Sequence, residues 1–194
     1  MPQLLYLHGF LSSPGSFKAV QVRDWLTQHR PDIRYCCPAL TPHPCATRAT
    51  LTQIMRDAQG PVGVMGSSLG GFWATWLAEQ FGVRAVVINP SVNPMALLPQ
   101  YLHKPVKNFH NDDTYTLTER DLADLAACDT PSLQDPARYW LMVQTGDETL
   151  DYRLAVAKYQ RCRQTVEAGG DHAFQGFERH IEAAVNFLLP IEEQ

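Results

Sequence analysis

The pentapeptide Gly-Ser-Ser-Leu-Gly at residues 66–70 has the G-x-S-x-G spacing of a serine nucleophile held at a sharp turn between a strand and a helix. An apolar run at 61–65 precedes it, and the most apolar helical stretch of the chain follows it. Glycines two residues before and two residues after the serine relieve backbone clashes at such a turn. Ser68 is therefore predicted to attack a carbonyl carbon, beside helix N–H groups that favour the developing negative oxygen.

A base that could accept the serine proton follows the last predicted strand. Residues 169–172 read Gly-Gly-Asp-His and lie between that strand, at 163–167, and the final predicted helix. Imidazole suits this role because it titrates near neutral pH. His172 is the candidate base, and the alternative interpretation is a surface-loop histidine, which fits the remaining loop histidines His29, His43, His103 and His110. His180 falls within a predicted helix, away from the strand ends.

Three carboxylates follow the predicted strand at 139–145 and compete for the role of orienting the histidine. Asp147 lies nearest the strand end, after a glycine that frees the turn. Asp151 resembles the N-cap of a helix over 152–159, and Glu148 is expected to be solvated. We therefore predict Asp147 as the third member of the set, in the chain order serine, acid, histidine.

The oxyanion of an acyl-transfer intermediate needs two N–H donors. His8-Gly9-Phe10 follows the first predicted strand, where one such donor is expected, and the other is expected directly after the nucleophile. The predicted donors are the backbone N–H groups of Phe10 and Leu69. His8 could itself act as a base, but it precedes the serine in the chain and is interpreted as structural.

An alternative without catalysis also accounts for the glycines. Gly66, Gly70 and Gly71 could simply allow close packing of a helix on a strand. The histidine turn, the carboxylates after the fifth strand and the motif at residues 8–10 favour the catalytic interpretation over this one.

Short apolar segments alternate with helical ones, which predicts an α/β fold with a mostly parallel sheet of about six strands and helices on both faces. The predicted strands are residues 3–7, 33–37, 61–65, 85–89, 139–145 and 163–167. By analogy with related folds their order is 2-1-3-4-5-6, with the site at their carboxyl ends.

The first helix is predicted to start near Ser13-Pro14 and to carry Phe17, Val20 and Trp25 inward. The second spans about 46–58, the third begins at Ser68, and the last spans about 174–188. Trp73 and Trp76, at helical spacing, are expected to pack in the core and not to form a recognition surface.

The segment 90–138 is predicted to be an insertion after the fourth strand. It contains prolines, a polar patch at 108–116 and a helix over 119–127 introduced by Thr118 with Asp121 three residues on. Residues 104–118 could form a small lid over the site.

Composition limits the classes of protein that fit. A chain of 194 residues with 45% hydrophobic residues supports one domain over residues 1–194, and a net charge of −4 without a basic cluster argues against nucleic acid. Apolar runs are too short to cross a bilayer, and no signal segment opens the chain, so a cytoplasmic location is expected. Five cysteines without Cys-x-x-Cys spacing are expected to be reduced and mostly buried.

Motifs for other chemistry are absent from the sequence. There is no phosphate-binding glycine loop and no His-Glu-x-x-His. Residues 110–113, His-Asn-Asp-Asp, carry possible metal ligands, but adjacent loop residues rarely converge on one ion. No cofactor and no metal are therefore expected.

Four segments closely resemble the YqiA-like esterases, small bacterial members of the α/β-hydrolase superfamily. They are residues 8–14 (HGFLSSP), 66–71 (GSSLGG), 144–148 (QTGDE) and 169–174 (GGDHAF). The resemblance covers nearly the whole chain. It implies a compact hydrolase core without the first two strands of larger relatives, activity on acyl esters or thioesters without a metal, and Ser68, Asp147 and His172 as the catalytic triad.

The sequence thus predicts a serine carboxylesterase acting on a small-molecule acyl ester through an acyl-enzyme. An acyl thioesterase of the acyl-CoA type, with the same triad, is the first alternative. A non-catalytic binding protein with the same fold is the second. The natural substrate, the acyl-chain length and the oligomeric state are not determined by the sequence.

Overall fold

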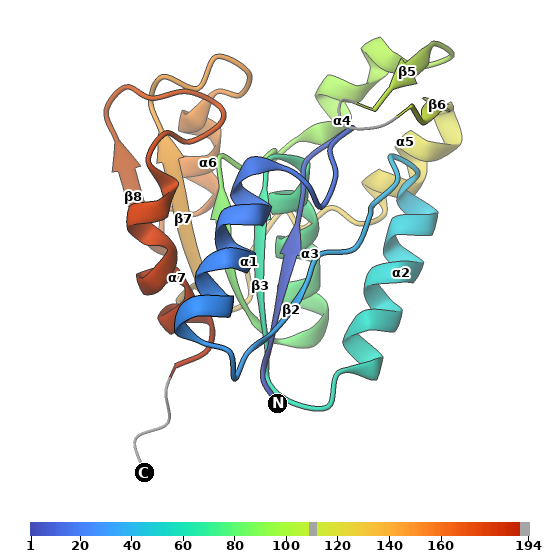
Figure 1. Cartoon of the computed structure of the whole chain (residues 1–194). Coiled ribbons are helices and arrows are strands. Elements are labelled where there is room, and N and C mark those ends of the chain that lie inside the picture. The colour runs from blue at the N-terminus through green and yellow to red at the C-terminus, as the bar shows by residue number, and fades with distance from the viewer. Residues whose placement is uncertain (109–111, 191–194) are drawn as a thin grey trace.

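A parallel six-stranded sheet forms the centre of the computed structural model, which describes residues 1–108 and 112–190 (Figure 1). Its strands are β1 (Gln3–Leu7), β2 (Arg34–Cys36), β3 (Val62–Ser67), β4 (Arg84–Ile88), β7 (Tyr139–Gln144) and β8 (Arg163–Glu167). Their order, β2-β1-β3-β4-β7-β8, is the predicted one, and every neighbouring pair is parallel. All carboxyl ends of the strands therefore meet at one edge, at the top in Figure 1.

Alternate residues of the central strands enter two separate cores. On β1, Leu4 and Tyr6 face the helices α1 (Phe17–His29) and α7 (Ile181–Leu188), which lie in front of the sheet in Figure 1. Leu5 and Leu7 face the opposite layer. That layer contains α2 (Pro44–Asp57), α3 (Leu69–Phe81), α5 (Glu119–Ala126) and α6 (Tyr152–Lys158). Because both faces are covered, β1, β3, β4 and β7 appear in the sequence as largely apolar runs, as predicted, whereas the edge strands β2 and β8 are only partly buried and carry polar residues.

Helix α3 packs against the middle of the sheet. Trp73 and Trp76 are 3% and 8% exposed and belong to the core, as predicted. The helix ends at Gly82, which adopts the left-handed conformation at φ +68° that closes a helix without a side-chain penalty.

The first helix differs from its prediction in both start and phase. It begins at Phe17, because turns in which Ser12 and Ser16 donate to the carbonyls of Gly9 and Ser13 occupy the preceding residues. Phe17 is 75% exposed, so the prediction that it points inward was wrong. Val20 and Trp25 are only half-buried, and the positions that enter the core are Ala19, Val22 and Leu26.

The last helix is shorter than predicted. The chain turns at Phe174 and Gly176, which have φ values of +60° and +72°, and then forms the 3-10 turn η3 (Phe177–His180). Helix α7 begins only at Ile181. Left-handed residues cannot continue a right-handed helix, so the predicted start at 174 was wrong.

The segment 90–138 contains short elements, most of which lie near the carboxyl end of the sheet (Figure 1), whereas η2 directly precedes β7 at the amino end. They are α4 (Pro94–Leu97), η1 (Leu98–Tyr101), an antiparallel hairpin of β5 (Pro105–Lys107) and β6 (Thr114–Thr116), α5 and η2 (Pro136–Arg138). The predicted capping box of Thr118 and Asp121 starts α5. Residues 109–111, which include His110 of the possible metal motif and part of the predicted lid, lie outside the described residues.

The five cysteines are all free thiols, and they differ in exposure. Cys128 is buried, while Cys36, Cys37 and Cys162 are half-buried. Cys45 is exposed in the first turn of α2, so the expectation that the thiols are mostly buried was too broad. Within residues 1–108 and 112–190, no helix combines the length and hydropathy needed to span a bilayer.

Candidate active site

Ser68 occupies a strained turn between β3 and α3. Its φ of +56° and ψ of −123° lie in a region that non-glycine residues rarely adopt. Three backbone hydrogen bonds hold it there: its N–H donates to the carbonyl of Ile88 at 3.1 Å, and its carbonyl accepts from the N–H groups of Gly71 and Ser91, each at 2.9 Å. The turn presents the serine at the start of the most buried helix.

The glycines of the motif are required by close backbone contacts. A Cβ atom on Gly66 would lie 2.1 Å from the carbonyl oxygen of Gly70. A Cβ atom on Gly70 would lie 2.0 Å from the carbonyl oxygen of Leu7, at the end of β1. Close packing and the presentation of Ser68 are thus the same requirement, because three backbone segments meet at this turn.

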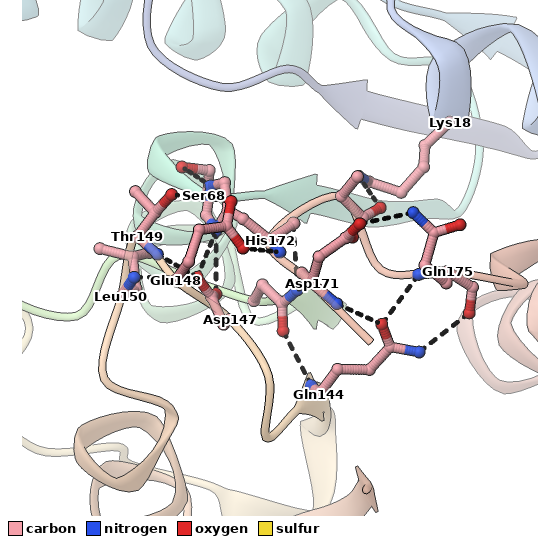
Figure 2. A network of polar contacts seen from close by, with 12 residues as sticks. Lys18, Ser68, Gln144, Asp147, Glu148, Thr149, Leu150, Asp171, His172 and Gln175 are labelled. Atoms are coloured by element: carbon pink, nitrogen blue, oxygen red, sulfur yellow. Dashed lines mark hydrogen bonds and ion pairs between the residues drawn. The ribbon is translucent and has the colours of Figure 1, made fainter. Parts of the chain in front are cut away.

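Ser68, His172 and Asp147 form a continuous chain of hydrogen bonds (Figure 2). The Oγ of Ser68 lies 3.1 Å from Nε2 of His172. Nδ1 of His172 lies 2.9 and 3.0 Å from the two carboxylate oxygens of Asp147. Since an ionised carboxylate can only accept, Nδ1 carries the proton and Nε2 is free to accept the serine proton.

Asp147 is held as a carboxylate despite its burial. Its side chain is 1% exposed, and burial by itself disfavours the charge. Hydrogen bonds from His172, and from the N–H groups of Leu150 and Thr149 at 2.9 Å each, outweigh that effect and hold the pKa of the carboxyl below its usual value. The negative charge is therefore fixed beside the imidazole.

The two competing carboxylates serve other contacts. Asp151 caps α6 by accepting the N–H of Arg153 at 3.0 Å and also binds that residue's guanidinium at 2.8 Å. Glu148 is exposed, as predicted, but its carboxylate accepts the backbone N–H of His172 at 3.0 Å. Of the three carboxylates, Asp147 is the one that reaches the imidazole.

Gln144 at the end of β7 holds the loop that carries His172, and the sequence analysis missed it. Its Oε1 accepts the N–H groups of Asp171 at 3.2 Å and Gln175 at 2.8 Å (Figure 2). Its Nε2 donates to the carbonyl of Gln175 and to Glu167, both at 2.9 Å. Only 3% of this side chain is exposed, so a buried amide replaces the backbone partners that the loop lacks.

Asn89 after β4 completes this support. Its Nδ2 donates to the carbonyls of Asp171 at 3.0 Å and His172 at 3.1 Å, and its Oδ1 accepts the N–H of Gln144 at 3.0 Å. The available sequence signal was a polar amide at the end of each of two apolar strands, where a loop must find hydrogen-bond partners.

Lys18 on α1 anchors the same loop from the other side. Its ammonium donates to the carbonyl of Ala173 at 2.6 Å (Figure 2). Burial lowers the pKa of this lysine to about 8, although the nearby charges of Asp171 and Asp147 oppose the shift.

The other histidines near the strand ends have structural contacts. His8 is 3% exposed; its Nε2 accepts the N–H of Leu40 at 2.9 Å, which leaves Nδ1–H to donate to the carbonyl of Gly9. Nε2 of His180 lies 2.7 Å from Oε1 of Glu167.

Phe10 and Leu69 lie beside Ser68, where the oxyanion donors were predicted. Leu69 is the first residue of α3, and a Cβ atom on Gly9 would lie 3.2 Å from that of Ser68. Phe10 and Ser68 line a cleft of about 630 Å³ together with His172. Phe10, Ser68 and Leu69 also line a second, smaller cavity of about 140 Å³.

One known protein family matches nearly the whole chain. The model of the uncharacterised protein family UPF0227 matches residues 3–189. The chain belongs to this family. A UPF0227 protein of Serratia proteamaculans is 25% identical over 189 residues, covering 92% of this chain and 94% of the relative. A second, of Shewanella sediminis, is 29% identical over 109 residues, or 53% and 58% of the two chains.

Solved structures similar to this UPF0227 protein share its fold. The α/β-hydrolase domain-containing protein 10 of mouse has a TM-score of 0.73 at 15% identity, covering 96% of this chain and 89% of that one. Est1E of Butyrivibrio proteoclasticus has a TM-score of 0.68 at 14% identity, covering 97% and 87%. The expected YqiA-like family and α/β-hydrolase fold are therefore confirmed.

Replacing Gly70 by alanine is expected to destabilise the protein by about 1–3 kcal/mol, because the new methyl group overlaps the carbonyl of Leu7. Urea denaturation measures the loss. Gly15→Ala is the control, since its Cβ would lie 3.4 Å from its nearest neighbour, the Oγ of Ser13. Equal stability of the two variants would contradict the close contact at the turn.

Gln144→Met is expected to displace the loop that carries His172, because the substitution keeps the length of the side chain and removes its hydrogen bonds. The rate of fluorophosphonate labelling of Ser68 should fall by roughly tenfold or more. Gln164→Met is the matched control: its amide donates to the carbonyls of Val156 and Tyr159, away from the loop. The idea fails if both variants label at the rate of the parent protein.

The stability of the fold is expected to depend on the charge of Asp147. Because its pKa is lower in the folded than in the unfolded chain, ionisation stabilises the fold above the ordinary value of 3.8. This contribution disappears as the pH falls through the lower, folded value. The difference in unfolding free energy between the parent and Asp147→Asn, measured by urea denaturation, should therefore be larger at neutral pH than in acid. A difference that does not change with pH would exclude this linkage.

Proposed function

We propose that this protein is a serine hydrolase that cleaves carboxylic esters through a covalent acyl-enzyme. The observation that carries the proposal is the hydrogen-bonded chain from Ser68 through His172 to a buried Asp147, which opens into a cleft at the carboxyl edge of the sheet. The α/β-hydrolase fold of the similar structures supports a hydrolase, and one of them is described as an esterase domain, from Rhodothermus marinus.

Acylation begins when Nε2 of His172 takes the proton of Ser68. The Oγ of Ser68 forms a bond to the ester carbonyl carbon, and the electron pair of the C=O bond moves to the oxygen. When the pair returns, the C–O bond to the alcohol breaks. The imidazolium gives its proton to the alcohol oxygen, so the alcohol leaves neutral and the acyl group remains on Ser68.

Deacylation repeats these steps with water. His172 takes a proton from the water while the water oxygen attacks the acyl carbon, and then returns the proton to Ser68 as the acid departs. The fixed negative charge of Asp147 stabilises the imidazolium in both halves of the reaction and holds the ring in the tautomer that accepts at Nε2.

The N–H groups of Phe10 and Leu69 are proposed to stabilise the oxyanion in both tetrahedral intermediates. The N–H of Leu69 is in the first turn of α3, where backbone donors have no partner within the helix. Two such donors, aimed at the developing charge, are each worth about 10²–10³ in rate in enzymes of this kind.

Ser68→Ala is expected to lower kcat/KM for p-nitrophenyl acetate by roughly 10⁴-fold or more, because it removes the nucleophile. Hydrolysis is followed by release of p-nitrophenol, and mass spectrometry measures covalent labelling by a fluorophosphonate. Ser13→Ala is the control, because the hydroxyl of Ser13 accepts the N–H of Gly15 in an exposed loop and takes no part in the chain from Ser68 to Asp147. The proposed function is wrong if Ser68→Ala hydrolyses the ester as fast as the parent protein.

A further inference from the structure

Two cavities meet at Ser68, and they differ mainly in size. The smaller, of about 140 Å³, has mostly apolar walls. Those walls include Leu69, Pro94, Leu97, Leu98 and Leu150. The larger, of about 630 Å³, also has mostly apolar walls, and its lining includes the side chains of Ser12, Lys18, Glu148 and His172. The rings of Phe10 and Tyr101, 5.3 Å apart between centroids, line both.

The position of His172 decides which part of an ester enters which cavity. After the C–O bond breaks, the imidazolium must pass its proton to the alcohol oxygen, so the alcohol has to lie on the His172 side of Ser68. His172 and the following Ala173 line the larger cavity. The acyl group, which stays on Ser68 while the alcohol leaves, is thereby directed into the smaller, apolar cavity.

We propose, building on the serine hydrolase function above, that the substrates are esters of a short apolar acid with a larger alcohol. The cavity of about 140 Å³ on the acyl side limits the length of the acid that fits there. The alcohol cavity has more than four times that volume, so it admits a bulkier group than the acyl cavity does.

The insertion supplies the wall that limits the acyl group. Leu97 ends α4 and Leu98 begins η1, and both line the smaller cavity. Leu98 is 6% exposed and packs in the core, whereas Leu97 is 39% exposed. Removing either side chain enlarges the acyl side without touching Ser68, His172 or Asp147.

A pair of reversed esters tests the assignment. Octyl butanoate and propyl nonanoate have the same composition and the same two alkyl groups, and differ only in which side of the ester bond carries the long chain. Octyl butanoate is expected to be hydrolysed with a kcat/KM at least about tenfold higher, because an apolar pocket discriminates by size at that level. Equal rates, or a preference for propyl nonanoate, would overturn the assignment.

Variants of the cavity walls test whether the smaller cavity causes the preference for octyl butanoate. Leu98→Ala is expected to reduce the preference for octyl butanoate by raising kcat/KM for propyl nonanoate, and Leu97→Ala, at a more exposed position, provides the same test if Leu98→Ala does not fold. Leu154→Ala is the matched control, since this leucine of α6 is 55% exposed and lines neither cavity. A preference that both cavity variants leave unchanged would exclude the smaller cavity as the acyl site.

The two proposals fail in different ways. If the activity of the parent protein on p-nitrophenyl acetate does not depend on Ser68, the hydrolase function fails. If that activity depends on Ser68 but the reversed esters react equally, the function stands and the orientation of the substrate is wrong.

Discussion

The left-handed conformation of Ser68 is the constraint on which the site depends. A positive φ at a residue with a side chain costs on the order of 1–3 kcal/mol and persists only where the surroundings fix it. Here hydrogen bonds from the ends of β4 and α3 fix it, and two glycines let β1, β3 and α3 approach within backbone contact. A buried parallel sheet with α3 packed across its middle provides the stability that offsets the strain.

His172 is held by a different kind of interaction. The loop after β8 lies beyond the last strand pairing, so its N–H and C=O groups cannot continue the sheet. Buried amides of Asn89 and Gln144, at the ends of the two preceding strands, bind those groups instead. Adjacent parallel strands thus supply both the position of Asp147 and the support for His172, and one edge of the sheet gathers residues that are 104 positions apart in the chain.

The insertion shapes the site without entering its hydrogen-bonded chain. Its short helical elements place leucines on one side of Ser68, while the loop of His172 and α1 bound the other. In the proposed reaction the proton is delivered on the His172 side, so this asymmetry assigns the alcohol to that side of Ser68 and the acyl group to the other. The proposed division of roles is that the sheet and its loops supply the reacting groups, while the segment between β4 and β7 limits the acyl group.

Several features followed from the sequence alone. Apolar runs predicted the strands, and the spacing of the glycines predicted the turn at Ser68, because both depend on residues close together in the chain. Chain order and turn composition favoured Asp147 over Glu148 and Asp151, which the geometry supports. Tertiary structure alone decided that Phe17 faces solvent. Which side chains of α1 face the core depends on the residue at which the preceding turns end and the helix begins.

The supporting amides and the two cavities were likewise decided only by tertiary structure. Asn89 and Gln144 are polar ends of apolar strands in the sequence, and nothing local shows that a loop far along the chain will bind them. The volumes of the two cavities arise from the insertion packing against the strand ends, a contact between distant segments. Local spacing therefore determined which groups could react, and long-range packing determined what supports them and what fits beside them.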